Sequence, residues 1–114
     1  MSRVKIGKHF FPGTGNNNVL QIIAPAANIH GVILRTISLG SGTTGLAQVA
    51  LYADVTAPVA PGDGNCRQIA VVNVPNFTSF IVPYEIEVPA GLGVWVGFPN
   101  STGQIQMTYD FVDI

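Results

Sequence analysis

The sequence contains few charged residues. Lys and Arg sum to 5 and Asp and Glu to 6, so charged residues make up 10% of the 114 positions, against about 25% in an average soluble protein. A folded chain of this size exposes roughly 6000 Å², which leaves about one charge per 500 Å². Such a surface costs little to desolvate. We therefore expect the chain to associate with itself or with other proteins, rather than to remain a monomer solubilised by neutral polar side chains.

Other absences exclude whole classes of function. The net charge is −1 and no stripe of Lys and Arg is present, which argues against nucleic-acid binding. No run approaches the ~18 apolar residues of a membrane-spanning helix, so no membrane contact is expected. The basic N-terminus runs into Pro12 and Gly13 without an apolar segment, so we expect no signal peptide. Cys66 is the only cysteine, which excludes an intrachain disulfide.

Catalytic, cofactor and metal motifs are equally scarce. The run Gly40–Gly45 matches the spacing of a dinucleotide-binding loop, but the strands that follow lack the required helix, and a Gly-rich hairpin loop explains it. His9 and His30 lie in strand-like runs without a recognisable nucleophile and acid. Cys66 beside Arg67 is only a weak candidate for a reactive thiolate. No C-x-x-C or H-x-x-x-H pattern occurs. We expect no enzyme activity, no cofactor and no metal.

The sequence is instead rich in short strand-forming runs separated by its 13 glycines and 8 prolines. Thr78–Val88 and Gln104–Val112 alternate apolar and polar residues, as half-buried antiparallel strands do. In the first run, the residues predicted to face inward are Phe80, Val82, Tyr84, Ile86 and Val88. Pro83 lacks an N–H and predicts a sheet edge or a bulge. The remaining expected strands are Val4–Phe10, Val19–Ala24, Ile29–Leu39, Leu46–Asp54, Gln68–Val74 and Val94–Phe98.

About eight short strands with no helical crossover predict an all-β, antiparallel fold. Its architecture is then a β-sandwich, a jelly roll or a small barrel. Outward positions on the Thr78–Val88 run carry Glu85 and Glu87. Two carboxylates on one face of a strand are typical of its solvent side, so we do not interpret them as a catalytic pair.

The first eighteen residues differ from the rest. Residues 13–18 have the Gly/Asn composition of a hinge, and we expect 1–18 to form an arm or edge strand before a sandwich domain at 19–114. Three of the five basic residues precede the hinge: Arg3, Lys5 and Lys8. Near the other end lie Asp110 and Asp113. A basic arm and an acidic tail would join neighbouring subunits, or pair within one chain.

Trp95 is the only tryptophan and faces opposite to Val94, Val96 and Phe98 on its strand. If those three residues are core, Trp95 points outward, where tryptophan is a common interface or sugar-stacking anchor. A position beneath a loop is equally compatible with the pattern.

Three stretches resemble the small structural β-sandwiches of tailed phages, in particular the decoration (cement) proteins of their capsids. They are Ile33–Thr36, Tyr84–Gly91 and Tyr109–Asp113. The resemblance implies a jelly-roll-like sandwich that is made in the host cytoplasm and located in the virion. It would bind the major capsid protein or other virion subunits as a homo-oligomer. The assembly contacts that we expect on this basis are Arg3, Lys5, Lys8, Phe10, Phe11 and Trp95.

An alternative function is a carbohydrate- or receptor-binding module of a phage tail or fibre. Exposed aromatic rings stack on sugars, and the candidate rings are Trp95, Tyr52 and Tyr84.

Overall fold

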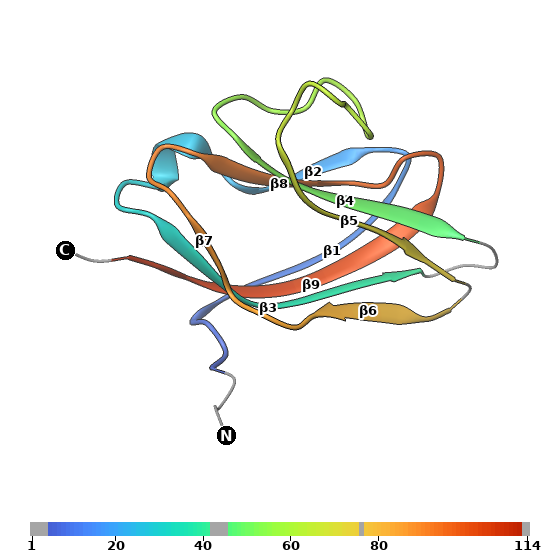
Figure 1. Ribbon diagram of the computed structural model, residues 1–114, viewed down its shortest axis with the longest axis horizontal. Coiled ribbons are helices and arrows are strands. Elements are labelled where there is room, and N and C mark those ends of the chain that lie inside the picture. Colours follow the sequence, from blue (N-terminus) through green and yellow to red (C-terminus); the bar gives the residue numbers. More distant parts are fainter. Residues whose placement is uncertain (1–4, 42–45, 76, 113–114) are drawn as a thin grey trace.

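The computed structural model describes residues 5–41, 46–75 and 77–112, which form two antiparallel sheets packed face to face (Figure 1). The first sheet contains, in spatial order, β1 (His9–Asn16), β9 (Thr102–Phe111), β3 (Val32–Ser41) and β6 (Ser79–Val82), with β7 (Ile86–Val88) also paired to β3. The second contains β2 (Val19–Ile23), β8 (Gly93–Gly97), β4 (Ala47–Asp54) and β5 (Gln68–Val74). A single 3-10 turn, η1, covers Pro25–Ala27. No helix in the described ranges is long and apolar enough to cross a membrane.

The strand pairing is that of a jelly roll. The first strand pairs with the last, β1 with β9, and the pairing then proceeds inward along the chain: β2 with β8, β3 with β6 and β7, and β4 with β5. The chain is therefore one long antiparallel hairpin rolled into two sheets, as in jelly-roll domains. The expectation of an antiparallel, jelly-roll-like sandwich of about eight strands is confirmed.

The predicted run Thr78–Val88 is divided into two strands. β6 ends at Val82 and β7 begins at Ile86, both paired to β3, and Pro83, which has no N–H for the ladder, opens the gap between them. The inward prediction holds for Val82 and Val88, which are buried, but is wrong for Phe80 and Tyr84, which are exposed. At the edge of the sheet and in the gap, the facing sheet does not cover these side chains.

One core lies between the two sheets. In β9, Ile105 and Met107 are fully buried and Tyr109 and Phe111 pack against the core, which confirms the alternation predicted for this strand. Other large contributors are Leu34, Ile37, Leu39, Val49, Leu51, Val94, Val96 and Phe98. Side chains from both sheets thus interdigitate between the layers of the sandwich.

The N-terminal strand lies later in the chain than predicted. The strand expected at Val4–Phe10 is β1 at His9–Asn16, which pairs with β9 along its whole length. The glycines interpreted as a hinge are strand residues. A Cβ on Gly15 would lie 2.5 Å from the Phe98 ring, so glycine at this position permits close packing of β1 on the core.

Candidate functional site

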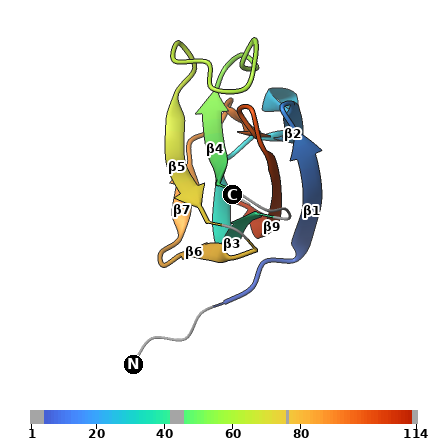
Figure 2. The same cartoon turned by 90° about the vertical axis from the view of Figure 1, so that its right-hand side faces the viewer.

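Trp95 is buried, which corrects its prediction as an exposed contact. Its side chain does point away from the core formed by Val94 and Val96, but residues 55–67 fold over that outer face of the second sheet (Figure 2). Trp95 is 4% exposed and clusters with Tyr52 and with other residues of this small outer core: Ala50 and Cys66. The position beneath a loop is the correct one. Tyr52 is also fully buried, and of the three proposed stacking rings only Tyr84 is exposed.

Two carboxylates hold this covering loop in place. Asp54 accepts hydrogen bonds from the backbone N–H groups of Arg67 and Val55, and Asp63 accepts them from Val59 and Asn65. These bonds stabilise the ionised carboxylates and lower the pKa of both aspartates.

Cys66 remains a thiol in this environment. Burial raises the pKa of the Cys66 thiol, and the negative charges of Asp54 and Asp63 raise it further. The idea of a reactive thiolate at Cys66 is therefore not supported by its surroundings. Cys66 packs instead as a small apolar side chain beneath the loop.

Acidification is expected to destabilise the domain through these carboxylates. Because the folded-state pKa of Asp54 and Asp63 is lowered, their contribution to stability is present above about pH 4, the ordinary carboxylate pKa, and is lost as pH falls through the lower folded-state pKa. Urea midpoints measured from pH 7 to about pH 2.5 should fall below about pH 4, and Asp54→Asn should flatten this dependence. Glu87→Gln, at an exposed carboxylate, is the control. A wild-type midpoint constant across this range would contradict the prediction.

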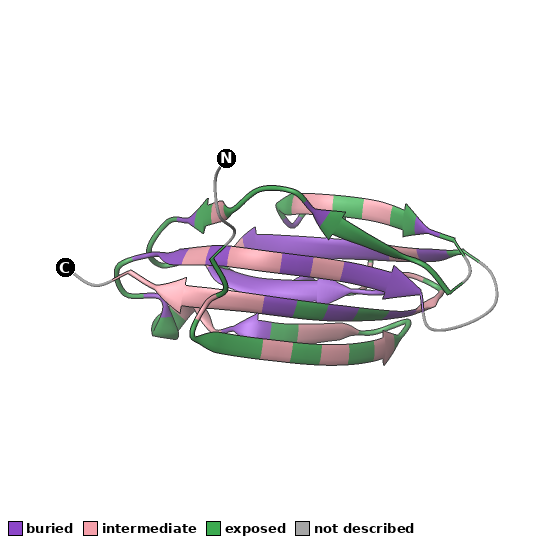
Figure 3. Cartoon of the chain, turned by 90° about the horizontal axis from the view of Figure 1, so that it is seen from below, coloured by how far each residue is buried: buried purple, intermediate pink, exposed green. Residues whose placement is uncertain are grey.

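The outer face of the first sheet carries a neutral groove, which we call the outer groove. It crosses four strands and has a volume of about 320 Å³. Its floor comes from β3 and β9 and its two rims from β1 and β6; its outward-facing residues are Phe10, Thr36, Ser38, Ile81, Gln106 and Thr108. Figure 3 views this face, where exposed and less exposed positions alternate along β1 and β9. No charged residue lines the groove.

Two large apolar side chains stand at the rims of the outer groove. Phe10 on β1 is 59% exposed and Ile81 on β6 is 68% exposed. Between them, the Thr36 and Thr108 hydroxyls lie 2.6 Å apart and hydrogen-bond to each other. The groove can accept a neutral, partly apolar protein segment, because desolvating it removes no charge from water.

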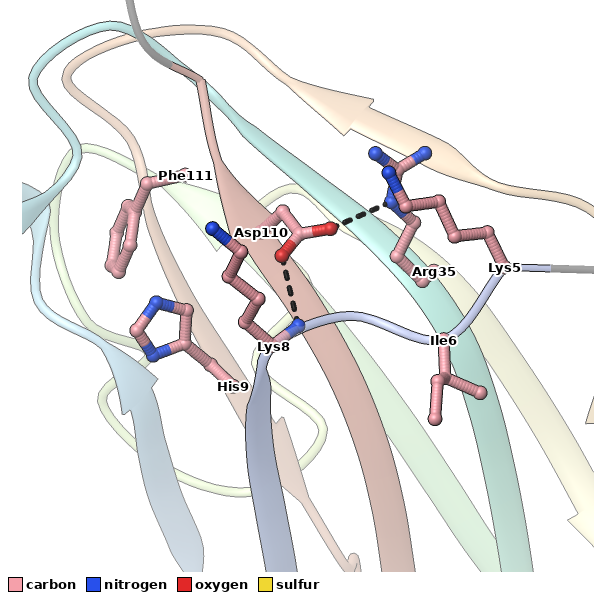
Figure 4. Close-up of a pocket in the computed structure, with 7 residues that line it drawn as sticks. All are labelled: Lys5, Ile6, Lys8, His9, Arg35, Asp110 and Phe111. Atoms are coloured by element: carbon pink, nitrogen blue, oxygen red, sulfur yellow. Dashed lines mark hydrogen bonds and ion pairs between the residues drawn. The ribbon is translucent and has the colours of Figure 1, made fainter.

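A second hollow, which we call the basic pocket, lies at the end of the same face. Residues 5–8 cross in front of β9 there (Figure 4), fixed by two backbone donors: Gly7 N to Thr108 Oγ1 at 3.0 Å and Lys8 N to Asp110 Oδ1 at 2.8 Å. The pocket encloses about 420 Å³. It is lined by Lys5, Ile6, Lys8, His9, Arg35, Asp110 and Phe111.

Arg35 organises the charges of the basic pocket. Its guanidinium donates to Asp110 Oδ2 at 3.0 Å and pairs with the Glu85 carboxylate at 3.1 Å. These bonds raise the pKa of Arg35. The Lys8 N–H and then the Arg35 guanidinium lower the pKa of Asp110. Asp110 is therefore an ionised anchor on β9, with both of its oxygens already bonded.

The remaining predicted contacts are distributed as follows. Lys5 and Lys8 line the basic pocket and Phe10 lies at the rim of the outer groove. Phe11, the next residue, points to the opposite side of β1 and packs against the core. Arg3 lies outside the described residues.

The strands on either side of the glycine-rich run do not form the expected hairpin. Residues 42–45 lie outside the described ranges, but β3 and β4 on either side belong to different sheets. A strand follows the run where a dinucleotide site needs a helix. Within the described part of the chain, no group of three or more His, Cys, Asp or Glu residues is placed to hold a metal ion.

Sequence reasoning did not single out most of the other residues that line these hollows, among them Ile81 and Arg35. Ile81 was recognisable, because it occupies an outward position in an alternating run and carries an apolar side chain there. Arg35 was the single charge within a long uncharged stretch, but its bonds to Asp110 and Glu85 depend on strand pairing that the sequence does not reveal.

Comparison of the chain with protein-family models, with curated proteins and with solved structures finds no match.

Proposed function

We propose that this chain is a virion structural protein that decorates or cements a capsid through protein–protein contacts, using the outer groove as its contact surface. The observation that supports this most is the uncharged lining of the outer groove, with Phe10 and Ile81 exposed at its rims. Interfaces are depleted of charge at their centre and are anchored by apolar and aromatic side chains.

The size of this face suits a protein partner. Four strands about 4.8 Å apart span roughly 19 Å, and the longest of them, β3 and β9, extend about 33 Å. Because β1 and β6 are shorter, the whole face projects less than about 600 Å². A stable interface buries about 800 Å² per partner, so this face supplies part of the required area and other surfaces must supply the rest. A subunit that binds only the assembled lattice stabilises that lattice by its binding free energy.

The alternative function is a carbohydrate-binding module. Two of the three aromatic rings expected to stack on a sugar are inaccessible in the folded chain. Trp95 and Tyr52 are buried, and stacking on a sugar requires an accessible ring face. We therefore favour protein contacts over glycan contacts.

The proposal is tested on particles of the virus whose genome encodes the chain. Gradient-purified particles should contain the chain. Particles assembled without the chain should bind it when the purified chain is added. The double variant Phe10→Glu, Ile81→Glu should stay folded and bind at least about tenfold more weakly, because it places charge in a desolvated contact. Val59→Glu, on the covering loop, is the matched control and should bind normally. A non-viral gene, or particles without the chain, would refute the proposal.

A further inference from the structure

The two sheets end in four edge strands, and three of these are protected against pairing with another chain. The edges are β1 and β6 in the first sheet and β2 and β5 in the second. An open edge presents unpaired backbone N–H and C=O groups, and a proline, a bulge or a short strand limits their pairing. β1 carries Pro12, and β6 has four residues and is followed by Pro83. β2 has five residues and a register shift between Gln21 and Ile23.

β5 is the edge strand that lacks this protection. It has seven residues, Gln68–Val74, which are rich in Val and Ile and include no charged residue, proline or glycine. Its register with β4 shifts next to Gln68, so the stretch Ala70–Val74 is paired regularly. Figure 2 shows β5 at the border of the second sheet, with β4 as its neighbour. Uncharged segments of this length and composition pair readily with a further strand.

The open edge of β5 presents both backbone and apolar groups. In an antiparallel ladder, alternate residues direct their N–H and C=O groups to opposite sides, so about half of these groups in β5 point away from β4. Ala70 and Val72 pack against the core but are only partly buried, whereas the β4 residues opposite them are fully buried. Val71, on the outer face of the sheet, is 42% exposed. A strand added beyond β5 would pair these backbone groups and cover the side of the core.

A second copy of the chain is the partner that these features favour. Within the 114 residues, each stretch outside the described ranges has at most four residues, too few to pair with β5 along its length. A two-fold axis at Val72 makes β5 antiparallel to its own copy and places Ala70 opposite Val74, so apolar residues meet on the inner face. Arg67, the charged residue nearest to β5 in the sequence, is five residues from this axis. Its two copies would lie roughly 33 Å apart along the strands, so their charges do not oppose the pairing.

We propose that two copies of this chain dimerise by pairing their β5 strands antiparallel, which joins their two four-stranded second sheets into one continuous sheet. Each copy contributes the same edge, so the association closes as a two-fold dimer. The pairing uses the second sheet, whereas the outer groove lies on the first. The dimer therefore does not depend on the virion role proposed above.

The experiment is sedimentation equilibrium of the full chain with charges placed on the β5 edge. The wild type should be a dimer at about 100 μM. The double variant Val71→Lys, Asn73→Lys should raise the dimer dissociation constant at least about tenfold, because like charges then face one another across the axis. The double variant Val71→Asp, Asn73→Asp should do the same. An equimolar mixture of the two variants should recover the dimer, since opposite charges then meet across the axis.

The matched control is Val55→Lys, Val59→Lys, which adds the same charge at two exposed positions of the covering loop and should leave the dimer unchanged. Circular dichroism should report the same fold for every variant, because all of the substituted side chains are exposed.

Amide hydrogen exchange identifies the surface that the dimer uses. The β5 amides that point away from β4 should exchange at least about tenfold more slowly in the wild type than in the lysine double variant. A wild type that is monomeric at about 100 μM, or a variant mixture that fails to associate, would overturn the proposal. A dimer whose β5 amides exchange at the same rate in both proteins would overturn it as well. Particle binding without dimerisation would refute only the β5 pairing, and dimerisation without particle binding would refute only the virion role.

Discussion

Replacing Trp95 with alanine is expected to lower the free energy of unfolding by about 3–5 kcal/mol, the usual cost of truncating a buried tryptophan. The indole fills the space between the second sheet and the covering loop, against Tyr52 and Cys66. Its loss leaves a cavity there. It also removes apolar support from a loop whose side-chain attachments to the sheet include hydrogen bonds to Asp54 and Tyr52.

Urea denaturation followed by circular dichroism measures this loss. Phe10→Ala is the matched control: it truncates an aromatic ring that is more than half exposed and should change the unfolding free energy by about 0.5 kcal/mol or less. If Trp95→Ala were as stable as the wild type, the loop could not cover the indole as described. A Trp95 variant that lost a binding activity would have to be checked for folding before any contact role was inferred.

The strands could largely be read from the sequence because strand formation leaves a local signal. The alternation in Gln104–Val112 identified β9 and its inward residues correctly, since period-two burial is imposed by the pleat itself. The partner of each strand could not be read in this way. β1 pairs with β9 across almost the whole chain, and no local feature of either strand encodes that choice.

For the candidate surfaces, too, the sequence revealed local features of single strands but not the contacts between distant segments. Alternation correctly indicated that Trp95 points away from the core, but it could not show that residues 55–67 lie over it, because coverage by a loop is a tertiary property. Lys5 and Lys8 stood out by their charge in a charge-poor chain. Their grouping with Arg35 depends on residues 5–8 crossing β9, which in turn depends on the hydrogen bonds of Gly7 and Lys8 to β9 side chains.

Deleting residues 1–18 is expected to prevent stable folding rather than to remove a dispensable arm. β1 supplies eight residues paired with β9, and Phe11 packs against the core. Losing this strand would expose the β9 edge and part of the core. The expected loss is on the order of 5 kcal/mol, comparable with the whole stability of a small domain. Circular dichroism and urea titration should show a molten or aggregated product.

A shorter deletion, of residues 1–6, separates the arm from the strand. It keeps Gly7 and Lys8, whose N–H groups bond to Thr108 and Asp110, so the urea midpoint should change by the equivalent of about 0.5 kcal/mol or less. It removes Lys5 from the basic pocket while the sandwich stays folded. If instead the deletion of residues 1–18 were as stable as the full chain, β1 could not be part of the first sheet, and the outer groove would lose the rim formed by Phe10. The comparison of the two deletions therefore separates the contribution of residues 1–6 from that of β1 to the stability of the sandwich.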